Sequence, residues 1–133
     1  MDKSKEMTEQ EQQQWVRAQY QIATKYLAEK GMITESVIVE ESRYLVPNVA
    51  IWKLNLINDA KVWVICGELP TDHANSDVSL NARDASRHFS LKWQLQAENL
   101  LKAGEHEQDS FAHSLISRAE GLYELFENEQ LWQ

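Results

Sequence analysis

Two apolar segments separated by a short polar turn constrain the fold of this chain more than any other feature. Residues 49–57 and 60–67 are rich in β-branched and aromatic side chains, and Asn58-Asp59 between them suits a two-residue hairpin turn. That turn length sets a register in which Trp52 and Trp63 share one face of the sheet. The sequence therefore predicts an antiparallel hairpin whose tryptophan-bearing face packs against helices.

A capping box predicts where the first helix begins. Thr8 and Glu11 have the spacing at which a hydroxyl and a carboxylate satisfy each other's backbone amides, and Gly31 supplies a stop. At 100° per residue one apolar stripe emerges between these signals. The stripe consists of Trp15, Val16, Ile22, Ala23, Tyr26 and Leu27.

Residues 37–39 are consecutive β-branched or aliphatic side chains, and Pro47-Asn48 is a turn signal. We therefore expect a first strand of uncertain extent before residue 47. The hairpin supplies a second and a third strand, and the third is expected to stop at Gly67.

Two further helices are predicted after the hairpin. Asn81 is a candidate N-cap for a helix that runs to Ala103, and Asp109 is a candidate N-cap for the last helix. The short connection at Gly104 favours an antiparallel pair. The main stripe of the first of these helices holds Ala82, Ala85, Phe89, Trp93, Ala97 and Leu100; that of the second holds Phe111, Leu115, Ile116, Ala119, Leu122, Tyr123 and Phe126.

The element order α-β-β-β-α-α predicts an α+β fold, a three-stranded antiparallel sheet packed against helices. The chain has 133 residues, close to the usual length of one domain. We expect a single domain over residues 8–133, preceded by a disordered tail over residues 1–7.

The helix from residue 82 to 103 carries a second apolar stripe, Leu91 and Leu95, on roughly the opposite side from its main one. Either this helix is central and contacted from two directions, or Leu91 and Leu95 form an oligomer interface. Trp132 lies beyond the last clear helical turn, where an indole either clamps the C-terminus or contacts another subunit.

The formal charge is −8, which argues against nucleic-acid binding. Most of the excess lies after Ala103, as a solvated acidic helix face or a docking surface for a basic partner. No run of apolar residues is long enough to span a bilayer, and the polar N-terminus does not resemble a signal peptide. We expect a cytoplasmic protein that binds neither nucleic acid nor membrane.

Candidate ligand-binding residues follow the third strand. Carboxylates and an imidazole there suit a cation, although their spacing matches no established metal motif and equally fits turn formation. Arginines in the first turns of the next helix suit a small anion, unless they pair with nearby carboxylates. The candidate set is Glu68, Asp72, His73, Asp77, Arg83, Arg87 and His88.

No complete catalytic constellation is present in the sequence. The single cysteine, Cys66, falls inside the third strand on a mixed polar and apolar face, where a thiol keeps a high pKa and stays inert. Serines at helical positions lack a neighbouring base. We predict no catalytic residue, no resident metal and no cofactor, and leave enzymatic activity open while favouring its absence.

The segment WVICGELPTDH and the later segment ARDASRHFSLKWQLQA resemble a family of small uncharacterised bacterial proteins that share the pattern W-x-I-x-G-x-L-P-T-D. The resemblance implies a bacterial cytoplasmic origin and transfers no catalytic residue. If that family has a site, it would draw on Gly67, Pro70, Asp72 and Arg87.

The leading hypothesis is a non-enzymatic protein-interaction or accessory domain, with self-association, for example as a homodimer. A small-anion or metal-binding domain or minor enzyme, using the residues after the third strand, is the alternative. A third possibility is an immunity or antitoxin-like protein that neutralises a basic partner through its acidity.

Overall fold

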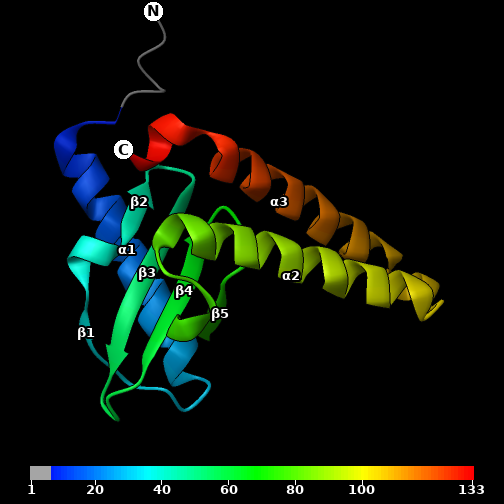
Figure 1. Ribbon diagram of the computed structural model, residues 1–133, viewed down its shortest axis with the longest axis horizontal. Coiled ribbons are helices and arrows are strands. Elements are labelled where there is room, and N and C mark those ends of the chain that lie inside the picture. Colours follow the sequence, from blue (N-terminus) through cyan, green and yellow to red (C-terminus); the bar gives the residue numbers. More distant parts are fainter. Residues whose placement is uncertain (1–6) are drawn as a thin grey trace, which may run out of the picture. The chain divides into compact units, whose positions relative to one another are not determined.

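The computed structural model describes residues 7–133, and over that range the chain forms three α-helices and one five-stranded antiparallel sheet (Figure 1). It divides between Ser76 and Asp77 into two compact units, called here the sheet unit and the helical unit. The elements are α1 (Glu9–Ala28), β1 (Thr34–Val37), β2 (Arg43–Leu45), β3 (Val49–Leu56), β4 (Lys61–Gly67), β5 (Asp72–Asn75), α2 (Ala82–Lys102) and α3 (Asp109–Glu127).

The predicted α+β class is confirmed, whereas the predicted number of three strands is wrong. The sheet has the order β1-β3-β4-β5, and β2 also pairs with β3. The single strand expected before residue 47 is split by a 3₁₀ turn, Val39–Glu41, and the segment after Gly67 returns as β5. The tail predicted at residues 1–7 lies, apart from Met7, outside the described residues, and a single domain over residues 8–133 stays a prediction.

The register predicted for the β3–β4 hairpin is wrong by one residue. In the structure Trp52 pairs with Val64 and Lys53 with Trp63, so the two tryptophans lie on opposite faces of the sheet. The cause is the turn: Asp59 adopts a positive φ of 70°, and the backbone nitrogen of Leu56 donates to the Ala60 oxygen at 2.8 Å. This is a three-residue loop, which shifts every pair by one position relative to a two-residue turn.

Helix α1 covers the sheet face that carries Trp52, and the core of the sheet unit lies between them (Figure 1). The predicted capping box is present, with Glu11 and Thr8 exchanging hydrogen bonds of 3.0 and 3.1 Å. Ile22, predicted to face inward, is 44% exposed. The buried core residues are Ala23, Leu27, Ala50, Trp52, Leu54, Leu56, Val62, Val64 and Cys66. Cys66 is therefore on the core face and not on the predicted mixed face.

The opposite face of the sheet carries Trp63 beside Lys53. The Lys53 ammonium lies 5.2 Å from the centre of the Trp63 ring and forms an ion pair with Glu41 at 2.9 Å. The Trp63 indole nitrogen donates to the Ser76 carbonyl oxygen at 3.2 Å. Trp63 is thus fixed by contacts within the sheet unit that differ from those predicted for it.

In the helical unit α2 and α3 pack side by side and antiparallel, as predicted (Figure 1). The Asn81 side chain accepts from the Asp84 nitrogen at 2.8 Å, so the predicted N-cap is confirmed. Inside the pair, the Ser90 hydroxyl donates to the Ala119 carbonyl oxygen at 2.7 Å. The buried residues are Ala82, Ala85, Ser86, Phe89, Ser90, Trp93 and Ala97 from α2, and Ala112, Leu115, Ala119 and Leu122 from α3.

The predicted cap of α3 and part of its predicted apolar stripe, including Tyr123, are wrong. Asp109 is the first residue of the helix and not its cap, because Gln108 occupies that position and the Asp109 carboxylate instead contacts His106 at 3.2 Å. Phe111, predicted to be buried, is 53% exposed, since the side chain one residue later, Ala112, faces α2.

Candidate functional site

The seven predicted ligand residues are divided between the two units. Glu68 follows β4, but Asp72 and His73 belong to strand β5, where they pair with Ile65 and Val64. The prediction of an irregular loop over these residues is therefore wrong. Asp77, Arg83, Arg87 and His88 belong to the helical unit.

His73 is held in the sheet unit by a tyrosine from α1. The Tyr26 hydroxyl lies 2.8 Å from His73 Nδ1, and the Asp72 carboxylate accepts from the His73 backbone nitrogen, also at 2.8 Å. Burial, with a smaller contribution from the charge of Asp72, raises the pKa of Tyr26 to about 12. Tyr26 thus keeps its proton at neutral pH and orients the imidazole. Sequence reasoning missed this pair, because the two residues are 47 positions apart.

Arg83 is tied to the end of α3. Its Nε donates to the carbonyl oxygen of Phe126 at 2.9 Å, and its guanidinium lies 5.2 Å from the centre of the Phe126 ring. A cation at carbonyl groups near a helix C-terminus is favourable, so this contact stabilises the helix pair. It explains why Arg83 does not line the pocket described next.

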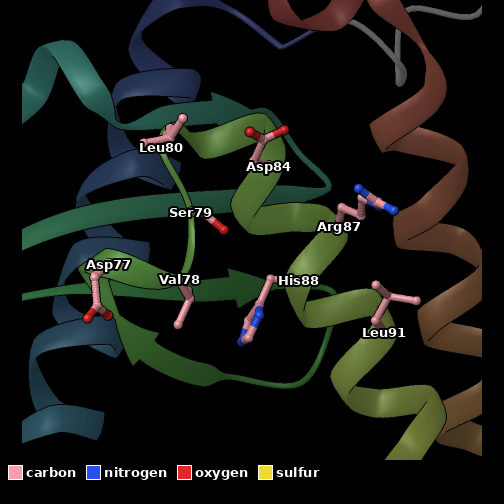
Figure 2. A pocket seen from close by; sticks show the side chains of 8 residues that line it. All are labelled: Asp77, Val78, Ser79, Leu80, Asp84, Arg87, His88 and Leu91. Atoms are coloured by element: carbon pink, nitrogen blue, oxygen red, sulfur yellow. The ribbon is translucent and has the colours of Figure 1, made fainter.

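A pocket of about 400 Å³ opens where α2 begins (Figure 2). Three predicted ligand residues, Asp77, Arg87 and His88, line it together, so the structure brings part of the predicted set into one place. Figure 2 shows His88 extending from α2 toward Val78, while Arg87 projects to the right of this view, away from Val78. The full lining is Asp77, Val78, Ser79, Leu80, Asp84, Arg87, His88 and Leu91.

The pocket carries charges of both signs. The carboxylates of Asp77 and Asp84 offset the charge of the Arg87 guanidinium, so the pocket is not strongly cationic. Asp84 was predicted only as part of the N-terminal helix signal. Arg87 and His88 lie three and four residues after Asp84, and Leu91 lies four and three residues after those two. This spacing is the sequence signal that the four side chains lie on one side of the helix.

The second apolar stripe predicted on α2 faces outward. Leu91 is 45% exposed and Leu95 is 61% exposed. They line a groove of about 620 Å³ along the helix. The groove residues are His88, Leu91, Lys92, Leu95, Gln96 and Asn99. Because His88 and Leu91 also line the pocket at the start of α2, the two features adjoin.

Trp132, the third predicted interface residue, is half-buried. Its indole nitrogen donates to the Leu125 carbonyl oxygen at 3.0 Å, and the same oxygen also accepts from the backbone nitrogen of Asn128 at 3.2 Å, where α3 ends. This contact corresponds to the alternative in which the indole clamps the C-terminus.

The burial of Cys66 disfavours its thiolate form, which is the form that reacts as a nucleophile. Burial raises the pKa of the Cys66 thiol to about 11, and its sulfur lies 3.6 Å from the carbonyl oxygen of Gln19. Over residues 7–133 no three His, Cys, Asp or Glu side chains gather in a way that could hold a metal ion. In the same range no helix has both the length and the apolar character needed to cross a membrane.

Comparison with known proteins places the chain within a family. A family model described as "Domain of unknown function (DUF4826)" matches residues 9–132. No curated protein and no solved structure matches the chain. The match agrees with the resemblance to an uncharacterised family, while a bacterial origin and a cytoplasmic location stay predictions.

Proposed function

This chain belongs to the family of the domain of unknown function DUF4826, and from its surface we propose that it is a protein-interaction domain that makes its contact through the outer face of α2. The supporting observation is the exposure of Leu91 and Leu95, neighbours on one side of the helix. Completing the burial of a half-exposed leucine is worth about 1 kcal/mol. Such a pair favours association without requiring it for folding.

The environment of the two leucines supports the same proposal. The groove along α2 is bordered by Lys92, Gln96 and Asn99, so an apolar centre has a polar border. Protein interfaces commonly have this arrangement, because the border exchanges hydrogen bonds while the centre excludes water. The opposite side of α2, with Phe89 and Trp93, is already buried.

A photo-reactive phenylalanine analogue at position 95 tests the proposal in the cell that makes the protein. Irradiation is expected to cross-link this chain covalently to a partner protein, and the additional substitution Leu91→Glu is expected to abolish the cross-link. The partner protein is also expected to bind the purified wild-type chain. The same analogue at position 57 is the control, because Ile57 is an equally exposed aliphatic residue of the hairpin loop. Adducts no stronger at position 95 than at position 57 would contradict the proposal.

The pocket at the start of α2 supports a second candidate function, binding of a small polar ligand. Arg87 is the side chain best suited to a carboxylate or phosphate group, since its guanidinium can donate two parallel hydrogen bonds. We expect millimolar phosphate or citrate to raise the melting temperature of the wild-type chain by a few degrees and that of Arg87→Ala by less. Equal shifts in both proteins, or none in either, would rule out this function for the pocket.

A further inference from the structure

We infer that the partner on the outer face of α2 is a second copy of this chain, packed antiparallel about a two-fold axis at the level of residue 93. The inference rests on the proposed function and names its partner. It follows from the order of charges along α2. When two copies of the helix run in opposite directions, a negative position of one copy lies opposite a positive position of the other.

Six residues on the outer side of α2 follow the spacing of a coiled-coil seam. Successive gaps of four, three, four, three and four residues keep side chains on one narrow stripe of a helix. The stripe lies opposite the buried side of α2, and all its members are exposed except the half-buried His88. The seam consists of Asp84, His88, Leu91, Leu95, Glu98 and Lys102.

An antiparallel two-fold pairing brings opposite groups of this seam together. With the axis at residue 93, Leu91 meets Leu95 of the second copy, and the leucines form the centre of the contact. Asp84 then meets Lys102 of the second copy at one end of the seam, and the two-fold symmetry repeats this contact at the other end. Among residues 7–133, Asp84, Glu98 and Lys102 form no ion pair within the chain. Their charges are therefore available to a partner.

A parallel pairing is disfavoured by the same residues. Each position would meet its own copy, which places Asp84 against Asp84, Glu98 against Glu98 and Lys102 against Lys102. Three like-charged contacts oppose the parallel arrangement. In the antiparallel arrangement Asp84 and Lys102 instead form attractive pairs, and Glu98 lies opposite His88. The charge order thus selects orientation, and the leucines supply the apolar contact.

The contact is expected to be weak. The seam is about 27 Å long at 1.5 Å per residue, and one helix pair of that length buries less than a standard protein interface. Lys92 borders the seam beside the axis, where the residue opposite it is the uncharged Gln94 of the second copy, so this position adds no attractive pair. We therefore expect a dissociation constant in the micromolar range or above, and an oligomeric state that depends on concentration.

Sedimentation equilibrium of the full chain over a concentration series tests the inference. The wild type is expected to dimerise, and Asp84→Lys and Lys102→Asp are each expected to weaken the dimer on the order of tenfold. Each single variant places like charges opposite each other. Mixed in equal amounts, the two variants are expected to form a heterodimer of near wild-type affinity, because both ends then carry opposite charges. This recovery also shows that both variants are folded.

Other results overturn the inference in distinguishable ways. A wild-type chain that stays monomeric to millimolar concentration removes the second copy as partner but leaves the proposed function intact if position 95 still forms adducts with another protein. A dimer that Leu91→Glu abolishes, yet the charge variants and their mixture leave unchanged, removes the antiparallel register. A dimer that neither kind of substitution affects does not use this face of α2.

Discussion

Cys66 is a thiol whose chemistry is suppressed by its position between α1 and the sheet. It is fully buried, and a pKa of about 11 leaves about 100-fold less thiolate at pH 8 than a thiol of pKa 9 would have. We predict that Cys66 reacts with a disulfide reagent at least about 100-fold more slowly in the native protein than in urea. Equal rates in both conditions would mean that the thiol is accessible.

Gly67 ends β4 with a backbone that only glycine accommodates. Its φ is +125°, and a Cβ there would lie 2.5 Å from the carbonyl oxygen of Asn48. Gly67→Ala is expected to lower the free energy of unfolding by about 2–4 kcal/mol, measured by urea titration. Gly121→Ala is the matched control: it lies in α3 with nothing near its Cβ, and is expected to gain about 0.5–1 kcal/mol.

Tyr26 gives the stability of the fold an alkaline limit. Its pKa is raised to about 12 in the folded chain from an ordinary value near 10, so the unfolded chain releases the proton first. The stabilisation is complete below pH 10 and is lost as pH rises from 10 to 12. Tyr26→Phe is therefore expected to make the decline of unfolding free energy with pH shallower in that window and to leave the slope between pH 6 and 8 unchanged. Parallel curves above pH 10 would contradict this origin.

At the scale of elements, the signals that sequence reveals best are those confined to a few residues. Thr8 with Glu11 and Asn81 with Asp84 mark helix starts that the structure reproduces, since each cap depends only on local geometry. The register of the hairpin depends instead on one dihedral angle. Asp59 enters the left-handed region, and the sequence Asn58-Asp59 suits two loop lengths equally well. Strand β5 escaped prediction because its sequence, DHAN, has neither apolar alternation nor β-branched residues.

The hairpin loop can be tested at Asp59. Its φ of 70° costs an ordinary side chain energy that glycine avoids. Asp59→Gly is expected to raise the free energy of unfolding by about 0.5–1 kcal/mol, and Asp59→Val to lower it by about 1–2 kcal/mol, both by urea titration. A stabilising valine would show that the two-residue turn, with its other register, is accessible to the chain.

In the candidate site, too, contacts between residues close in the sequence could be predicted, whereas contacts between distant residues could not. Asp77, Arg87 and His88 lie within twelve residues of one another, so only the short segment that leads from Asp77 into α2 is needed to bring them to one pocket. Tyr26 and His73 meet only because α1 crosses the sheet beside β5, which no local pattern encodes. Arg83 belonged to the predicted set by proximity in sequence, but the end of α3 competes for its guanidinium.

At the scale of the whole molecule, the division between Ser76 and Asp77 raises the question of cooperativity. Each unit has fewer than 80 residues, a size at which one core alone rarely supplies more than a few kcal/mol. We therefore predict that the intact chain unfolds in one transition, with tryptophan fluorescence and far-ultraviolet circular dichroism giving the same urea midpoint. A helical signal that outlasts the fluorescence change would instead indicate two domains.

The borders of the sheet limit how this protein can aggregate. On one side β1 and β2 have four and three residues, with a 3₁₀ turn between them and a bulge between Thr34 and Ser36, and on the other side β5 has only four residues. Broken, short strands are poor templates for adding a strand from another chain. The native sheet thus offers few edge positions at which strands of other chains could add by backbone pairing in an amyloid-like way.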